Sequence, residues 1–575
     1  MKKLKRLSGY LTICLSSLAL IACNSDSQSS NINNLKQAKL LYWQAPTILN
    51  PHLSTGFKDS EASRLTLEPL ASFDKEGKLI PILAQEIPTL ENGGIGKDGK
   101  SVVWKLRKDV KWSDGQPFTA KDVVFTYEFI TNPQVGSVNA GDYAIVDKVE
   151  TLDDYTVKVS FKEVTPAWYS VFVGNAGLIL PQHLYAQYNG ANVREAPYNL
   201  MPVGTGAYKV VQFKPGDSVI YQPNSYYRQP EKLNFEQIEI KGGGDATSAA
   251  RAVLQTGEAD FAHNLQVEAN ILESLQKSGK GQLVANFGSL SERIIFNFTD
   301  PNRSTDEGEK SSLQYPHPFF SDVKVRQALA MAVDKETIAN QLYGVTGKAT
   351  NNYIVAPEEY VSSENSMTYN PEKASQLLNE AGWKDTNGDG IRDKNGVEMK
   401  IVFQTSVNPL RQKTQAIVKQ NWQSLGVGVE LKSVDASVLF SSDPSNNDTV
   451  EKFSADVQMF TTGNLSPDPI AYLKNHTCDN IPQKSNNWSG DNYSRYCNPE
   501  YDQLWQKATK ELNPQTRAEI FKQMNDLLVE EAAVIPLIHR ADVVGVSNNL
   551  FGVNLTPWDF KTWNIADWEK KAEGK

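Results

Sequence analysis

The stretch Trp104-Lys-Leu-Arg-Lys-Asp-Val-Lys-Trp-Ser-Asp-Gly-Gln-Pro-Phe-Thr-Ala-Lys-Asp-Val-Val-Phe-Thr-Tyr127 combines a strand, a turn and a helix. Residues 102–107 predict the strand, and the Ser-Asp-Gly run at 113–115 is typical of a turn. Thr119 can then cap a helix whose apolar residues recur every three or four positions. The stretch therefore predicts a protein of the mixed α/β class.

The rest of the chain repeats this alternation without a fixed period. A hairpin is expected around Pro215-Gly-Asp217, because two alternating runs flank that turn. The other expected strands are 157–161, 399–404 and 427–431, and the other expected helices are 323–343, 371–381 and 412–425.

The N-terminal segment has the form of an export signal. Lys2 to Arg6 are mostly basic, and Leu7 to Ala22 are uncharged and mostly apolar. The following Leu20-Ile-Ala-Cys23 resembles a lipobox, which implies that residues 1–22 are a lipoprotein signal peptide and that Cys23 carries lipid. Ordinary cleavage, with Cys23 a bystander, is the alternative.

Residues 23–35 are polar and are expected to form a flexible tether. No later run of 18 uncharged apolar residues follows, so the mature protein is expected to be held at a bacterial membrane by its lipid alone. It would face the periplasm or the cell surface. Asn24 is not the aspartate that commonly retains such lipoproteins at an inner membrane.

Composition fits a large set of soluble domains. The 575 residues are enough for two or three compact lobes, and the net charge of −9 argues against a nucleic-acid partner. Apart from Cys14 and Cys23, the cysteines are Cys478 and Cys497. An exported chain permits oxidation, so a disulfide between them is expected, with a metal site that includes His476 as the alternative.

Catalytic motifs are incomplete. Residues 94–101 spell a P-loop, but they lead into a strand rather than a helix, so a glycine-rich turn is expected. Ser-x-x-Lys occurs at 274–277 and 321–324 without its partner motifs. We therefore expect no enzyme and no cofactor, and a secreted hydrolase remains the alternative from another class.

A calcium-like loop occupies residues 385–393. Asp385, Asn387, Asp389 and Asp393 supply oxygens at the spacing of an EF-hand loop, but its closing glutamate is replaced by Gly396. A helix precedes the loop and a strand follows it. A structural turn is therefore expected, and a weak calcium site is the alternative.

Six further segments, which follow residues 104–127 in the sequence, carry short motifs of their own. In order, they are Val203-Gly-Thr-Gly-Ala-Tyr208, Asn224-x-x-Tyr227, Gly257-Glu-Ala-Asp260, Val325 to Asp334, Tyr369 to Gly382 and Leu425-Gly-Val-Gly-Val-Glu430. Together they resemble the family 5 extracellular solute-binding proteins, which bind oligopeptides, dipeptides and nickel complexes for ABC importers. The resemblance covers nearly the whole mature chain.

The resemblance implies a two-lobed periplasmic-binding-protein-like fold of the class II type, with an extra third domain on a discontinuous first lobe. Residues 36–70, 180–295 and 536–575 would form lobe I, residues 71–179 the extra domain, and residues 296–535 lobe II. It also implies a monomer that closes on a di- or oligopeptide and presents it to an importer permease. The alternatives keep the fold but bind a metal chelate, haem, an oligosaccharide or a cell-wall peptide, or act as a peptide sensor without a transporter.

The resemblance is less informative for the ligand residues. Peptide-binding members place an aspartate shortly before an Asp-Pro pair, where it binds the peptide ammonium. If Asp468-Pro469 is that pair, the position three residues earlier is Leu465, which cannot form an ion pair. Either Asp468 substitutes, with Asn464 beside it, or the ligand has no free amino terminus. A simple turn role for Asp468 is the third possibility.

Other candidates follow from residue type. Arg411 matches a recurrent family arginine and could clamp a carboxylate, or it could be a surface residue near a helix start. Trp43, Phe460 and Trp488 could form cleft walls, although core packing is the commoner role of such rings. The loop between Cys478 and Cys497 resembles the disulfide loop of dipeptide-binding members.

Overall fold

The structure is a computed structural model that describes residues 35–54, 56–365, 367–441, 443, 445–464 and 466–572. The expected signal peptide (1–22), the lipidation site Cys23, the tether up to residue 34 and Leu465 lie outside the described residues. Within the described part, no helix has the length and apolar character needed to cross a membrane.

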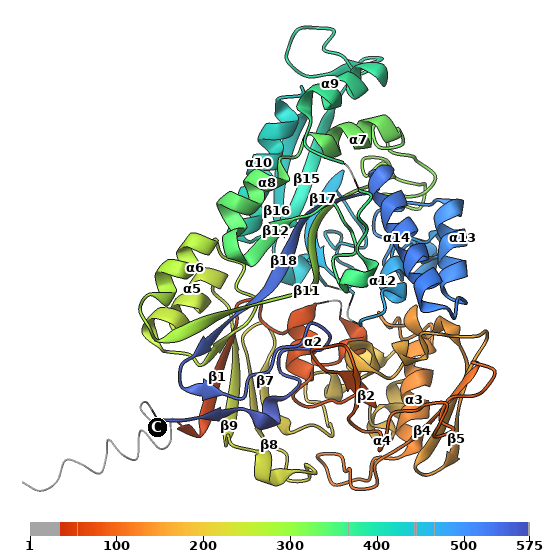
Figure 1. Cartoon of the computed structure of the whole chain (residues 1–575), viewed down its shortest axis with the longest axis vertical. Helices are drawn as coiled ribbons and strands as arrows, with labels where there is room; N and C mark the ends of the chain where they lie inside the picture. The colour runs from red at the N-terminus through yellow and green to blue at the C-terminus, as the bar shows by residue number, and fades with distance from the viewer. Residues whose placement is uncertain are drawn as a thin grey trace, which may run out of the picture.

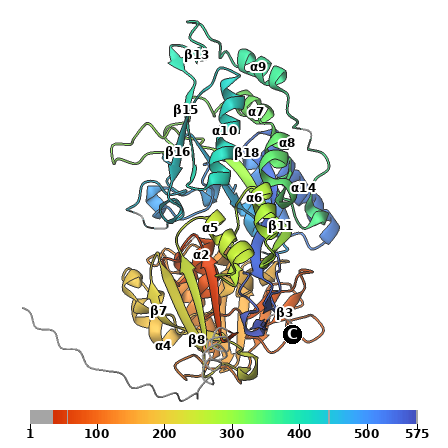
Figure 2. The same ribbon diagram turned by 90° about the vertical axis from the view of Figure 1, so that its left-hand side faces the viewer.

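One large sheet runs through both halves of the molecule (Figures 1 and 2). Its described strands follow the order β16-β15-β17-β11-β18-β10-β1-β9-β8-β7, and β12 pairs with β18. The bounds of these strands are β1 (Gln37–Tyr42), β7 (Tyr208–Lys214), β8 (Ser218–Pro223), β9 (Gln237–Gly242), β10 (Phe261–Ala262), β11 (Gly281–Phe296), β12 (Gly347–Ala349), β15 (Lys400–Ser406), β16 (Gly428–Val434), β17 (Val457–Thr462) and β18 (Val534–Ser547).

The long antiparallel strands β11 and β18 connect the two halves. Residues 281–287 of β11 pair with 541–547 of β18 in the half that contains β10, β1, β9, β8 and β7, which is the lower half in Figure 1. Residues 291–295 pair with 534–539 in the half that contains β17, β15 and β16, which is the upper half. The register shifts between Phe287 and Ser291. At this irregularity His539 Nε2 donates a hydrogen bond to the Gly288 carbonyl at 2.7 Å. The ladder is thus interrupted where the chain passes from one half to the other.

The lower half carries the segment quoted first. The strand predicted at 102–107 is β4 (Ser101–Lys105), which joins β5 (Val146–Asp153) and β6 (Thr156–Phe161) in a three-stranded sheet. Thr119 caps helix α3 (Ala120–Thr131), as predicted, and Asp122 completes a capping box. A buried cluster from Leu53 to Ala196, with Trp558, packs beneath this helix.

The upper half confirms most of the predicted helices and strands. The predicted helix 371–381 is α9 (Pro371–Glu380), and the predicted helix 412–425 is α10, which begins earlier, at Pro409, and ends at Gln423. The helix predicted over 323–343 was wrong as a continuous element. Helix α7 (Val323–Met331) ends before Asp334, whose carboxylate accepts the Thr337 amide at 3.0 Å and starts a new short helix.

The remaining elements complete the two halves. They are α2 (Phe57–Ser63), β2 (Ala71–Phe73), β3 (Leu79–Pro81), α4 (Gln182–Tyr185), α5 (Ala246–Arg251), α6 (Ala269–Gln276), α8 (Lys335–Ile338), β13 (Asp393–Lys394), β14 (Val397–Glu398), α11 (Ala436–Leu439), α12 (Ile470–Lys474), α13 (Pro499–Ala508), α14 (Pro514–Glu530), β19 (Leu550–Phe551) and β20 (Glu569–Lys570). Helices α12, α13 and α14 lie together at one side of the upper half (Figure 1).

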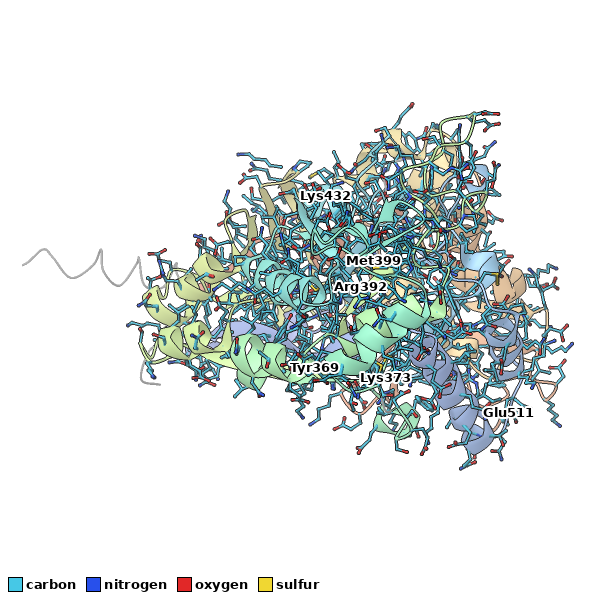
Figure 3. The ribbon with its side chains drawn as sticks, turned by 90° about the horizontal axis from the view of Figure 1, so that it is seen from above. Tyr369, Lys373, Arg392, Met399, Lys432 and Glu511 are labelled. Atoms are coloured by element: carbon cyan, nitrogen blue, oxygen red, sulfur yellow. A yellow bond between two sulfur atoms is a disulfide. The ribbon has the colours of Figure 1, made fainter. Side chains whose placement is uncertain are left out.

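The calcium-like loop joins α9 to the β13–β14 hairpin. Asp385 accepts the amides of Gly388 (2.7 Å) and Gly390 (3.0 Å), and Asp393 accepts the Thr386 amide at 2.9 Å. These carboxylates therefore stabilise the backbone of a turn. In Figure 3, which views the molecule from this end, Arg392 and Lys373 mark the turn and α9. Within the described part, no group of three or more His, Cys, Asp or Glu side chains is arranged to hold a metal ion.

The expected disulfide is confirmed in the structure: Cys478 and Cys497 are bonded, with their Cα atoms 4.7 Å apart. The bond closes a loop that contains Trp488, Asp491 and Tyr493. Closing such a loop limits the freedom of the unfolded chain. Asp491 and Tyr493 of this loop line a cavity between the two halves.

Candidate ligand-binding site

Two connected cavities lie between the halves of the molecule. The first has a volume of about 110 Å³, and the second has a volume of about 260 Å³. Phe57, Thr462 and Tyr493 line both. Because lower-half residues such as Phe57 and upper-half residues such as Tyr493 share these walls, the cavities form one cleft across the β11–β18 crossing.

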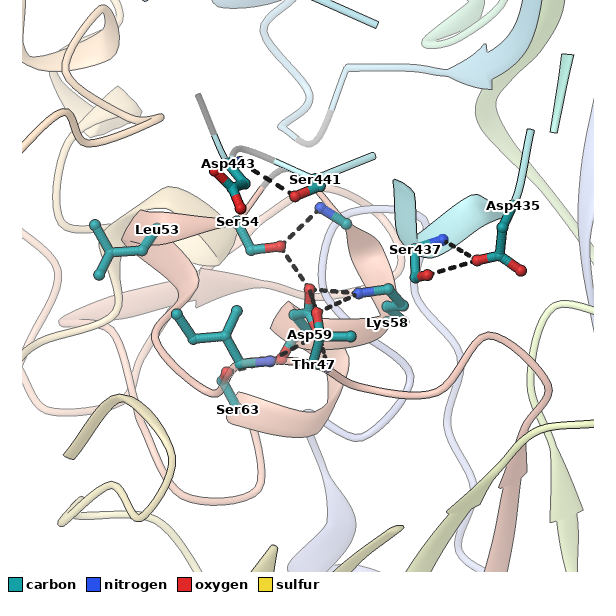
Figure 4. Close-up of polar contacts among 12 residues, drawn as sticks. Thr47, Leu53, Ser54, Lys58, Asp59, Ser63, Asp435, Ser437, Ser441 and Asp443 are labelled. Atoms are coloured by element: carbon teal, nitrogen blue, oxygen red, sulfur yellow. Dashed lines mark hydrogen bonds and ion pairs between the residues drawn. The ribbon is translucent and has the colours of Figure 1, made fainter. Parts of the chain in front are cut away.

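The N-terminus of α2 forms one edge of the cleft (Figure 4). Asp59 is buried and accepts hydrogen bonds from the Thr47 amide (2.6 Å), Ser54 Oγ (2.5 Å) and Lys58 Nζ (2.6 Å). These bonds hold the loop before α2 in place. Figure 4 shows this group facing Ser437 and its neighbours in the upper half, at the side of the first cavity.

Arg411 lines the first cavity but is deeply buried, which excludes the surface alternative. Its Nε donates to Glu292 Oε1 at 3.0 Å, Nη1 to Ser406 Oγ at 2.8 Å and Nη2 to Thr461 Oγ1 at 3.1 Å. Asn408 caps α10 and thereby places Arg411 in the first helical turn. The guanidinium therefore ties the start of α10 to β11 and β17. Its predicted role in binding a ligand carboxylate stays a prediction.

Asp468 lines the second cavity and already has protein partners. Its carboxylate forms a buried ion pair with Arg517 of α14, in which Nη2 donates to Oδ1 at 3.1 Å. Tyr169 of the lower half donates its hydroxyl to Oδ2 at 3.3 Å, and the Ile470 amide donates to Oδ1 at 3.0 Å. Asp468 thus joins α12, α14 and the lower half. Its predicted role toward an ammonium group stays a prediction.

The other predicted residues are divided between the cleft and its surroundings. Phe460 lies in the wall of the first cavity and Asn464 in the wall of the second. Trp43 lies behind the first cavity, where its Nε1 donates to the Asn264 carbonyl at 2.8 Å. Trp488 lines a neighbouring hollow, with Lys452 Nζ 5.5 Å from its ring centroid. The cleft therefore brings together Arg411, Phe460, Asn464 and Asp468, but not the two tryptophans.

Two arginines on the crossing strands were missed. Arg293 of β11 donates to Thr462 and, at 3.1 Å, to the Tyr472 hydroxyl, and its guanidinium lies 4.9 Å from the Phe460 ring centroid. Arg540 of β18 donates to Asn264 Oδ1 at 3.0 Å. Its Nε and Nη1 have no hydrogen-bond partner among the described residues. The available signal was the charged residues that interrupt the apolar runs of these strands, Glu292-Arg293 in β11 and Arg540 and Asp542 in β18.

Burial sets the charge state of the first cavity. Burial and the nearby Lys561 lower the pKa of His263 from 6.5 to about 3, so its imidazole, stacked on Tyr42, is neutral at pH 7. Burial raises the pKa of Glu61 to about 7, while Lys561 opposes that shift. Lys561 bridges Glu61 (3.1 Å) and Asp542, which secures the C-terminal segment under the cavity.

Most of this chain matches a known protein family. Residues 78–482 match bacterial extracellular solute-binding proteins, family 5 Middle. The chain belongs to this family. Its members are solute-binding proteins and not enzymes, so the predicted family and the non-enzymatic role are confirmed.

Individual relatives cover nearly the whole chain. The oligopeptide-binding protein AppA of Bacillus subtilis is 28% identical over 99% of both chains. A dipeptide-binding protein of Pseudomonas aeruginosa is 24% identical over 89% of this chain and 91% of its own.

Solved structures show the same fold. AppA of B. subtilis in complex with a nonapeptide has a TM-score of 0.79 at 25% identity, covering 93% of this chain and 99% of that one. NikZ of Campylobacter jejuni in complex with Ni(L-His) has a TM-score of 0.77 at 26% identity, covering 93% and 100%. The predicted class II binding-protein fold is therefore confirmed.

Asp468→Asn is expected to destabilise this solute-binding protein by about 3–5 kcal/mol, because it leaves the buried Arg517 without its counter-ion. Urea unfolding measures the loss. Asp306→Asn, at an exposed site, is the control, and the double variant Asp468→Asn/Arg517→Gln should lose less than the sum of its single variants. If the Asp468→Asn variant were as stable as the wild type, that result would contradict a stabilising role of the Asp468–Arg517 pair.

His263→Phe should alter the pH dependence of stability. Below pH 6.5 the unfolded chain protonates this histidine, whereas the folded chain protonates it only near pH 3. Wild-type stability therefore falls, relative to the variant, as the pH falls through this window. The difference in unfolding free energy between the wild type and His263→Phe should change by about 2 kcal/mol between pH 6.5 and pH 5. Urea unfolding at the two pH values measures this change. A difference that stays constant with pH would contradict a neutral buried ring.

Proposed function

We propose that this chain is the substrate-binding component of an ABC-type importer and that its solute is a di- or oligopeptide. The observation that carries the proposal is the connected cleft between the two halves, which offers aromatic rings beside buried charged and amide groups. The names of the relatives, an oligopeptide-binding and a dipeptide-binding protein, support a peptide.

The proposed mechanism is hinge closure about β11 and β18. The division that we propose is lobe I (36–70, 180–295 and 536–575), the extra domain (71–179) and lobe II (296–535). The register shift between Phe287 and Ser291 supports bending at the crossing, since its ladder bonds are already interrupted. A ligand that touches both lobes only when they are closed shifts the population toward the closed form. The permease would then receive the closed, loaded protein.

A metal–amino acid complex is the second candidate solute. It is favoured by the similarity to the structure of NikZ, which holds Ni(L-His). The two candidates differ in the test below, because a peptide pool contains no metal and a nickel–histidine mixture contains no peptide.

The peptide proposal predicts a thermal shift. A pool of defined tetrapeptides at millimolar concentration should raise the melting temperature of the full-length protein, because a ligand that binds only the native state stabilises it by mass action. Individual peptides can then be ranked. A protein that responds to Ni(L-His) but not to any peptide pool would contradict the proposal.

We further propose that Cys23 carries a lipid that anchors the protein at the outside of a bacterial membrane. The basic residues 2–6, the apolar run 7–22 and the Leu-Ile-Ala-Cys sequence support the anchor.

Cys23→Ser should move the protein from the membrane fraction to the soluble exported fraction. Cys478→Ser, which leaves the export signal intact, should stay in the membrane fraction. Membrane association of Cys23→Ser equal to the wild type would contradict the anchor.

A further inference from the structure

Strand β11 passes from one half of the molecule to the other between Gly288 and Ser289. A Cβ atom on Gly288 would lie 2.6 Å from Pro557 Cβ, so Gly288 is packed tightly against the C-terminal segment in the lower half. Ser289 is held by the upper half: its Oγ donates to the Asn464 carbonyl at 2.5 Å, and a Cβ atom on Gly463 would collide with the Ser289 carbonyl oxygen. Two adjacent residues of one strand are therefore held by different halves.

His539 of β18 is positioned by the upper half and reaches across this boundary. It pairs with Ser291 of β11 and with Lys348 of β12, and Ser291 pairs in turn with β17 of the upper half. Its ring packs edge-on against Phe287, which belongs to a cluster of the lower half, with the ring centroids 5.2 Å apart. Its Nε2 lies 2.7 Å from the Gly288 carbonyl oxygen. One side chain thus links the two halves at the interrupted ladder.

The hydrogen bond between His539 and Gly288 has a fixed direction. A carbonyl oxygen can only accept, so Nε2 carries the proton. Burial lowers the pKa of His539, the bond to Gly288 opposes that shift and Lys348 adds to it, so the ring is neutral at pH 7. The bond stands where the register shift between Phe287 and Ser291 interrupts the ladder.

His539 lies outside both cavities of the binding cleft. Arg540, the next residue, and Asp542 line the first cavity. Successive side chains of a strand point to opposite faces, so His539 is half-buried on the reverse side of the sheet. A substitution at this position therefore changes the crossing of the strands and leaves the cavity walls intact.

The bond is present in a conformation in which the two halves touch. Tyr169 of the lower half donates its hydroxyl to Asp468 of the upper half at 3.3 Å. Lys413 of α10 forms an ion pair with Glu268 of the lower half at 2.6 Å. Opening the cleft would separate both pairs.

We propose that His539 is a positioning residue of the hinge, whose hydrogen bond to the Gly288 carbonyl holds the crossing strands in the closed arrangement and thereby strengthens ligand binding without touching the ligand. The inference deepens the proposed hinge closure and rests on it.

The physical reason is that opening moves the two partners apart. Gly288 would turn with the lower half and His539 with the upper half, and a hydrogen bond weakens steeply as its distance and angle change. The bond therefore favours the closed form over the open one. Its loss should lower the population that is competent to bind about fivefold, and the apparent affinity falls in the same proportion.

The test measures, by calorimetry on full-length protein, the binding of a peptide that raises the melting temperature. His539→Phe keeps a ring beside Phe287 but removes the donor, and it should weaken binding about fivefold. His539→Gln places an amide nitrogen close to the position of Nε2 and should bind within about twofold of the wild type. The control is His183→Phe, at a histidine of α4 that bonds Asp114 away from the crossing, and it should bind as the wild type does.

Thermal unfolding shows which variants are folded. If His539→Phe does not fold, His539→Asn repeats the test, because its amide is one bond too short to reach Gly288. Wild-type affinity in a folded variant without the donor overturns the assignment. A loss of affinity in His539→Gln equal to that in His539→Phe also overturns it, since the ring and not the bond would then be responsible.

A failure of the peptide assignment can be told apart from a failure of the hinge residue. If no peptide binds, amide hydrogen exchange of the ligand-free protein tests His539 alone. Exchange in residues 285–292 should be about fivefold faster in His539→Phe than in the wild type and in His539→Gln, because losing the bond frees the interrupted ladder. Equal exchange in all three proteins overturns the role of His539.

Discussion

The antiparallel pairing of β11 with β18 is the constraint on which the structure depends. Both strands belong to the large sheet on each side of the crossing, with β17 beside β11 above and β10 beside β18 below. Interrupting the ladder between Phe287 and Ser291 places a weak point between two well-paired segments. The cleft opens beside this point. The two strands that join the halves therefore also contribute to its walls, through Leu290, Arg293 and Arg540.

Buried charge explains why the cleft keeps its shape. A charge removed from water must be paired, and the pairs here are formed across distant segments: Arg411 with Glu292, Arg517 with Asp468, and Lys561 with Glu61 and Asp542. Each pair joins elements that would otherwise meet only through apolar packing. The polar atoms left over, such as Asn464 Oδ1, lie at the cavity wall, where a ligand can reach them.

The sequence predicted local structure well, because its signals are local. The segment 101–131, the hairpin at 215–217 and the cysteine pair follow from patterning, turn residues and export. The break at Asp334 was missed because the apolar spacing continues through it, while the carboxylate cap that causes it was not considered. The family resemblance supplied the overall fold, which spacing alone could not.

The site was harder to predict because its contacts join residues far apart in sequence. Arg411 has the residue type of a ligand clamp, yet it is bound to Glu292, 119 positions away. Trp43 and Trp488 have suitable rings, but the fold places them outside the two cavities.

Small-angle X-ray scattering tests the central claim, that a peptide is held between the halves across the β11–β18 crossing, most directly. The radius of gyration of the full-length protein should fall when a retained peptide is added to saturation, because binding favours the closed form. A radius of gyration that stays the same while calorimetry shows the peptide bound would contradict closure about these strands.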